Sequence, residues 1–103
     1  MKFYQMIFPP ITASKLKSIA TIARNQELIN EIISEIQKQI VDAAKKGYYE
    51  TTREFGLGPN GKVSELTSIA LDDVYRLFPG IEIMPGTSDR KNYVIYTFSW
   101  ESA

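Results

Sequence analysis

Gly56, Gly61 and Lys62 stand at the spacing of G-x-x-x-x-G-K, the loop that wraps nucleotide phosphates in many hydrolases. In such a loop, backbone N–H groups hold the phosphates, the lysine reaches the terminal ones, and an adjacent Ser or Thr hydroxyl holds magnesium. Here Val63 follows the lysine, so that hydroxyl is missing, and Ser64 comes one position late. At most, the segment predicts a passive anion-binding loop formed by Gly58, Gly61, Lys62 and Ser64.

The same segment also fits a turn that leads into a helix. Residues 58–61 read Gly-Pro-Asn-Gly, which places Pro, Asn and Gly at the second, third and fourth positions of a β-turn. Ser64 can then cap the following helix by accepting a hydrogen bond from one of its free N–H groups. In that case Lys62 lies before the helix and outside its first turn. We favour the turn and cap over a phosphate loop.

The composition excludes several kinds of catalysis. The chain of 103 residues contains neither histidine nor cysteine, so it lacks the commonest general base, a thiolate nucleophile and Cys-ligated zinc. Asp72 and Asp73 are adjacent and point about 100° apart on a helix, and Glu50 and Glu54 lie too far apart on a strand to share a proton. We therefore expect no enzymatic activity, no cofactor and no metal site.

Charge is distributed unevenly along the chain. Twelve basic residues balance twelve acidic ones, but residues 1–26 carry Lys2, Lys15, Lys17 and Arg24 and no acid. Residues 27–103 hold all twelve acids against eight bases, a net charge of 8 − 12 = −4. This asymmetry is typical either of a solvated helix face or of a basic segment that meets an acidic partner, such as a second copy.

No apolar run approaches the roughly 18–20 residues of a membrane span. We expect no membrane partner, and we expect a soluble protein of the cytoplasm or of a virus particle.

Hydrophobic periodicity predicts the element order β-α-α-β-α-β-β. The apolar stripe that begins at Leu16 slips before Leu28, which indicates a helix break near Asn25, a residue that could end the first helix or cap the second. Gly47 is suited to the position after the second helix. The expected elements are a strand at 2–8, helices at 13–24 and 26–46, a strand at 48–55, a helix after Ser64 that ends at 78–80, and a hairpin with strands at 81–84 and 92–100 around a tip at 85–91.

Two apolar surfaces define the expected fold class. Five isoleucines between Ile29 and Ile40 line one helix face, and Val94, Tyr96, Phe98 and Trp100 share one strand face. Burying both together predicts an α+β two-layer sandwich, with three helices on one face of a small, mostly antiparallel sheet. We expect one domain over 1–103, in which 1–25 is an oligomerisation or partner-binding arm.

Three segments carry a resemblance to a known type of protein. These are IVDAAKKGYY (40–49), LTSIALDDVYRLFPGIEI (66–83) and YVIYTFSW (93–100). With them, the stretch from Glu31 to Trp100 resembles small accessory proteins of bacteriophages. The resemblance implies an architecture and no catalytic residues, and it implies a protein that binds and blocks a host factor or serves in the particle. The first 30 residues lie outside it.

Two functions therefore stand as hypotheses. The first is a non-enzymatic interaction protein, phage-encoded and self-associating, that occupies a protein surface. Its expected interface residues are Lys15, Lys17, Arg24, Tyr49, Tyr93, Arg90 and Lys91. The alternative is a nucleotide or nucleic-acid binder that uses the loop 56–64 and the basic hairpin tip, with the aromatic side chains of 93–100 as a platform for base stacking.

Overall fold

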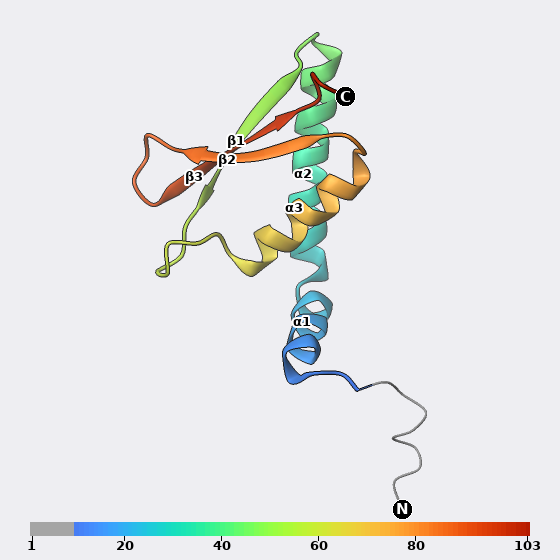
Figure 1. Ribbon diagram of the computed structural model, residues 1–103, viewed down its shortest axis with the longest axis vertical. Coiled ribbons are helices and arrows are strands. Elements are labelled where there is room, and N and C mark those ends of the chain that lie inside the picture. The colour runs from blue at the N-terminus through green and yellow to red at the C-terminus, as the bar shows by residue number, and fades with distance from the viewer. Residues whose placement is uncertain (1–9) are drawn as a thin grey trace, which may run out of the picture.

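The computed structural model describes residues 10–103 (Figure 1). The strand expected at 2–8 lies outside these residues. Within them the helices are α1 (Ala13–Arg24), α2 (Gln26–Lys45) and α3 (Glu65–Leu77), and the strands are β1 (Glu50–Gly56), β2 (Glu82–Thr87) and β3 (Tyr93–Ser99). The strand order is β1-β3-β2, and β3 pairs antiparallel with both neighbours.

The ends of the first two helices follow from local hydrogen bonds. The Thr12 side chain caps α1 by accepting from the backbone N–H of Lys15. Asn25 ends α1, because its side-chain amide donates back to the Thr21 carbonyl and makes no capping bond to α2. Beyond α2, Gly47 has φ 89°, and the N–H groups of Gly47 and Tyr48 donate to carbonyls of the last helical turn. The predicted break and the predicted role of Gly47 are confirmed.

The hairpin differs from expectation in one respect. β2 continues through Pro85 and Gly86 to Thr87, whereas the sequence predicted that the strand would end at Met84. The prediction was wrong because proline and glycine usually mark a turn, but an edge strand tolerates a proline. The tip is therefore shorter than expected, and Asn92 closes it with φ 65°.

The core lies between the sheet and two of the helices. Phe98 of β3 is fully buried and belongs to one cluster with side chains from α2, α3 and the segment before β2, namely Ile36, Ile40, Leu71, Val74 and Ile81. The predicted α+β architecture, with helices packed against an antiparallel sheet, is confirmed. α2 and α3 supply the helix side of this core (Figure 1), whereas α1, the third helix expected on the sheet, contributes no buried residue to it.

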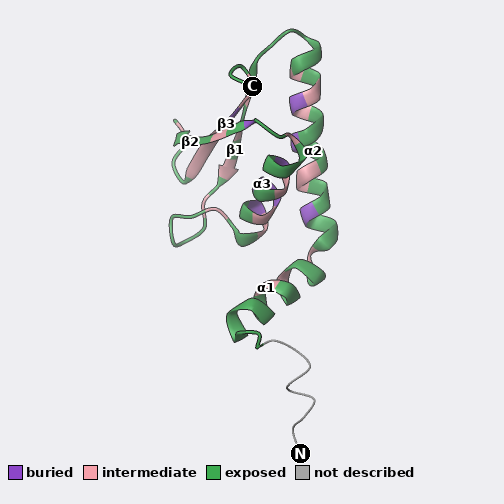
Figure 2. Ribbon diagram, turned by 45° about the vertical axis from the view of Figure 1, so that its right-hand side comes forward, coloured by how far each residue is buried: buried purple, intermediate pink, exposed green. Residues whose placement is uncertain are grey.

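α1 lies beyond the end of the sheet, and contact with the sheet buries none of its side chains. None of its residues is buried, and Figure 2 shows it as an almost entirely exposed extension of α2. Its apolar stripe of Leu16, Ile19, Ala20 and Ala23 is exposed along its whole length. α1 is thus amphipathic, but no surface of its own chain covers this apolar stripe.

Each edge of the sheet carries one feature that hinders the addition of a further strand. At β1, the Gln39 side chain of α2 donates to the Thr52 carbonyl at 2.6 Å and to the Thr51 hydroxyl at 2.9 Å. At β2, Pro85 has no N–H group to offer a neighbouring strand. Strand addition is therefore disfavoured on either side.

Candidate functional site

Three backbone N–H groups of the loop 56–64 donate hydrogen bonds within the loop, and the Leu57 N–H donates to the Asn92 carbonyl at 2.8 Å. The Gly61 N–H donates to the Gly58 carbonyl at 2.9 Å and closes the predicted turn, while the Gly58 N–H donates to the Lys62 carbonyl at 2.8 Å. The Lys62 N–H donates to the Asn60 side chain at 3.0 Å. A phosphate cradle requires such N–H groups to point at the ligand, and these three point into the loop.

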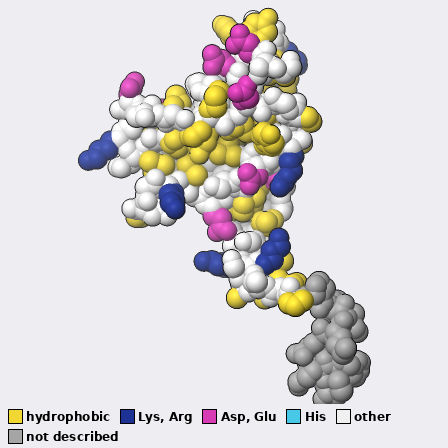
Figure 3. Space-filling model, viewed as in Figure 1, with side chains coloured by type: hydrophobic (Ala, Val, Ile, Leu, Met, Phe, Trp, Pro, Cys, Tyr) yellow, Lys and Arg dark blue, Asp and Glu magenta, His cyan; other side chains and the backbone are white. Residues whose placement is uncertain are grey.

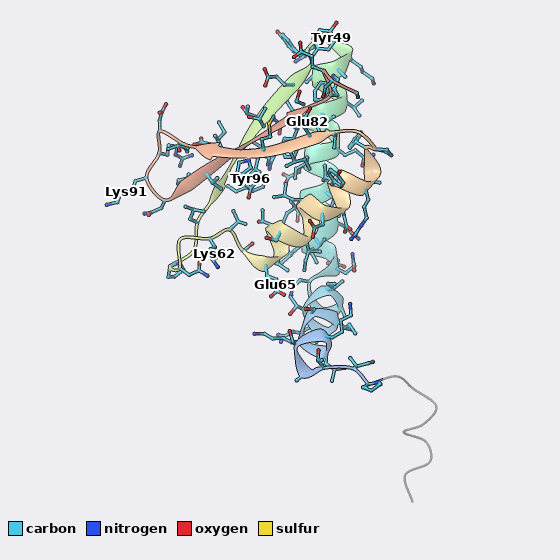
Figure 4. The ribbon with its side chains drawn as sticks, viewed as in Figure 1. Tyr49, Lys62, Glu65, Glu82, Lys91 and Tyr96 are labelled. Carbon is cyan, nitrogen blue, oxygen red and sulfur yellow. The ribbon has the colours of Figure 1, made fainter. Side chains whose placement is uncertain are left out.

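Ser64 acts as the predicted N-cap of α3. Its hydroxyl accepts from the Thr67 N–H at 3.2 Å and also hydrogen-bonds the Thr67 hydroxyl. Glu65 follows in the first helical turn, where its carboxylate repels an incoming anion. Lys62 lies on the exposed loop before the helix (Figure 4). These residues therefore close the turn and cap the start of α3.

We therefore expect no stabilisation of the protein by nucleotides. ATP with magnesium, or inorganic phosphate, at millimolar concentration should raise the melting temperature by less than about 1 °C, because a ligand stabilises only in proportion to its occupancy. Differential scanning fluorimetry checks this, with Lys62→Ala as the matched control. A larger rise that disappears in Lys62→Ala would establish an anion site in the loop.

The basic hairpin tip is tied to β1. The Arg90 guanidinium lies 3.8 Å above the Tyr93 ring centroid and 3.7 Å from the Glu54 carboxylate. The Ser88 hydroxyl donates to the same carboxylate and accepts from the Arg90 N–H. One face of the Tyr93 ring is thus already occupied, and Lys91 stays exposed at the tip (Figure 4).

The other aromatic residues in and just after β3 pack against their own chain. Phe98 is buried in the core, and Tyr96 meets Phe55 edge to face at 5.7 Å between ring centroids. The Trp100 indole N–H donates to the Tyr48 carbonyl at 3.1 Å. These rings do not form an exposed row on which bases could stack.

Among the described residues, acidic side chains do not gather into a group that could hold a metal ion. Over residues 10–103, no set of three carboxylates lies close enough to hold a metal ion. Asp73 pairs with Arg76 at 3.0 Å, and Glu35 pairs with Arg53 at 3.3 Å, both on the surface. Such exposed pairs contribute little to stability. Glu35 and Arg53 line a surface hollow of about 530 Å³ between α2 and β1, and Asp73 and Arg76 line a smaller one of about 350 Å³.

The most apolar hollow lies at the C-terminal ends of α2 and α3. It has a volume of about 560 Å³ and is lined by Ile40, Val41, Ala44, Lys45, Leu77, Phe78, Pro79, Ile81, Trp100 and Ala103. A small-molecule site usually adds a few convergent polar groups that fix the ligand. The indole N–H of Trp100 already donates to the Tyr48 carbonyl. It is therefore not free to hydrogen-bond a ligand in this hollow.

A groove lined by both apolar and polar side chains was not foreseen from the sequence. The α3–β2 groove, a hollow of about 400 Å³, runs between α3 and β2 and is lined by Ser68, Leu71, Asp72, Tyr75, Ile83 and Tyr96. It continues past Ser68 and Tyr96 into a further hollow of about 530 Å³ beside Val63 and Val94. Figure 3 shows hydrophobic side chains gathered on this face, and Figure 4 places Tyr96 between the strands and α3.

The residues expected at a partner interface lie in three separate places. Lys15, Lys17 and Arg24 are exposed on α1, and Tyr49, which is 63% exposed, lies before β1 at the opposite end of the molecule (Figure 4). Arg90, Lys91 and Tyr93 are at the hairpin tip. The structure therefore does not join them into one patch. The α1 group adjoins the exposed Leu16 and Ile19, and Tyr49 adjoins the exposed Tyr48.

These observations define a small α+β domain whose distinguishing surfaces are an uncovered helix and a groove. Comparisons of the chain with protein-family models, with curated proteins and with solved structures find no match. Within residues 10–103, every helix is too short or too polar to cross a membrane.

Proposed function

We propose that this protein is a non-enzymatic interaction protein that binds a protein surface through α1 and associates with itself. One observation carries the proposal: α1 presents an apolar stripe that its own chain leaves in water, with Leu16 53% and Ile19 48% exposed. An isolated helix of 12 residues is marginal in water. Covering the stripe would stabilise α1 and remove apolar surface from solvent.

Two further features support binding through a helix. The features at Gln39 and Pro85 on the two sheet edges disfavour association by strand pairing. Basic residues flank the apolar stripe of α1 and no acid accompanies them, which favours an acidic partner surface. The chain lacks the His and Cys on which many enzymes depend.

The resemblance of residues 31–100 to small bacteriophage accessory proteins supports the same function. It extends the proposal to the origin of the protein and to where its partner is found. The protein would be phage-encoded, and its partner would be a host factor in the cytoplasm or a component of the virus particle.

The double substitution Leu16→Ser and Ile19→Ser should abolish self-association. Each serine removes a half-exposed apolar side chain that would be buried in the assembly, and burying a whole one is worth about 1.5–3 kcal/mol. Size-exclusion chromatography with light scattering should give a multiple of the 11.7 kDa chain mass for the native protein and the chain mass for the variant.

Met84→Ser is the matched control, because Met84 is 44% exposed but lies on the strand face that the helices do not cover. Its mass should equal that of the native protein, and circular dichroism should show unchanged helix content in all variants. A native protein that runs as a strict monomer and retains nothing from host lysate would overturn the proposal.

A further inference from the structure

The α3–β2 groove carries a specific charge pattern along one wall. Glu65 and Asp72 are both exposed on α3, and neither forms an ion pair with any residue in the described part of the chain. They are seven residues apart, so they project from the same side of the helix about 10.5 Å from each other. Ser68, Leu71 and Tyr75 of the same helix line the groove beside them. The groove thus combines apolar side chains, such as Leu71 and Ile83, with the polar groups of Ser68 and two tyrosines, and its α3 rim is acidic.

α1 carries the complementary pattern. Its apolar stripe runs through Leu16, Ile19 and Ala23, while Lys17 and Arg24 follow one side of that stripe. Lys17 and Arg24 are also seven residues apart, so they too are separated by about 10.5 Å along one side of the helix. Lys15 lies on the opposite side of the stripe. The spacing of the two bases on α1 therefore equals the spacing of the two acids on α3.

We propose that the α3–β2 groove receives α1 of a second copy of this chain. Leu16 and Ile19 enter the groove against Tyr96, Ile83 and Tyr75, while Lys17 and Arg24 pair with the carboxylates of Asp72 and Glu65. This is the helix-in-groove mode of recognition, in which an amphipathic helix lays its apolar face into a hydrophobic groove. Each copy offers both a helix and a groove, so a two-fold pair satisfies all four surfaces.

A second copy fits this groove better than an unrelated helix would. The two surfaces carry opposite charges. The charged residues of α1 are all basic, and the groove rim has two acidic residues without an ion pair. Apolar area on α1 and apolar area in the groove are both uncovered in the single chain. Pairing of α1 with a second α1 would instead bring like charges together.

The inference rests on the proposed self-association and assigns its contact surface. Charge reversal on each side provides the test. Lys17→Glu with Arg24→Glu, and separately Glu65→Lys with Asp72→Lys, should each weaken dimerisation at least tenfold in sedimentation velocity at low salt. Combining all four substitutions restores opposite charges at both positions and should return the dissociation constant to within about threefold of the native value.

Matched controls separate this result from general charge effects and from misfolding. Glu31→Lys with Asp42→Lys changes the net charge equally on exposed positions of α2 outside the groove, and it should leave the dissociation constant unchanged. Glu65→Gln with Asp72→Asn removes the charges without reversing them and should weaken dimerisation less than the lysine pair does. Raising the salt concentration should weaken the native dimer and have little effect on this neutral pair.

The outcomes distinguish the two proposals. A native protein that stays monomeric overturns both. A native dimer that dissociates on Leu16→Ser with Ile19→Ser, but is unchanged by either charge reversal, overturns the groove assignment and leaves self-association through α1 in place. Two damaging reversals without rescue in the combined variant would overturn the pairing of α1 with α3.

Discussion

The Phe98→Ala variant is expected to lose about 3–5 kcal/mol of unfolding free energy, the range found for removing a buried aromatic ring. Phe98 has no exposed surface and lies at the centre of the cluster that joins α2, α3 and the sheet. It belongs to the central strand, so its register partners Thr51 and Ile83 lie on both neighbours. The ring therefore holds the two layers of the fold together.

Thermal denaturation followed by circular dichroism measures this effect. For a domain of this size each kcal/mol shifts the melting temperature by roughly 4–8 °C, so the midpoint should fall by more than about 12 °C. Tyr49→Ala is the control, because this mostly exposed ring should change stability by less than about 0.5 kcal/mol. A loss below 1 kcal/mol at Phe98, on the order of a surface substitution, would show that the core lies elsewhere.

Gly47→Ala is expected to cost about 1–2 kcal/mol, because an L-residue is strained in the left-handed conformation. Gly47 has φ 89°, and a Cβ atom built on it meets nothing within 4 Å. The cost is therefore conformational and involves no steric clash with a neighbour. The strain would lie where α2 ends and the chain turns into β1. Fraying of the C-terminal end of α2 should therefore accompany the loss of stability.

Gly56→Ala provides a control of opposite sign. Gly56 lies in β1 without a positive φ, and the nearest atom to its added Cβ is a ring carbon of Tyr93 at 3.9 Å. Alanine should stabilise the protein there by about 0.4–1 kcal/mol, because it restricts the unfolded chain. Urea denaturation of both variants tests the pair, and equal effects at the two glycines would contradict the assignment of strain to Gly47.

Local patterns in the sequence predicted most of the helices. The slip of the apolar stripe identified the break at Asn25, and Ser64 was recognised as a cap from its position before an amphipathic run. Both signals depend on residues close together in the chain, where spacing determines which side chains share a face. The same reasoning misjudged Pro85, since only the strand order shows that β2 is an edge strand.

The two surfaces proposed for binding were predictable to different degrees. Periodicity showed that α1 has an apolar face, but it could not tell whether Leu16 packs inside the chain or stays exposed. The α3–β2 groove was not predictable at all, because it arises from where α3 lies across the sheet. Tyr96 and Tyr75 are far apart in sequence and line the same groove only because of tertiary packing.

The single-residue junction at Asn25 also has a mechanical consequence. α1 has 12 residues, so at 1.5 Å per residue it is about 18 Å long and joins α2 at its C-terminal end. A rotation of about 10° at the junction would move the far end of α1 by about 3 Å, roughly half the 5–6 Å between neighbouring side chains along a helix. Small changes in the torsion angles of one residue therefore set how far Lys15 and Leu16 reach.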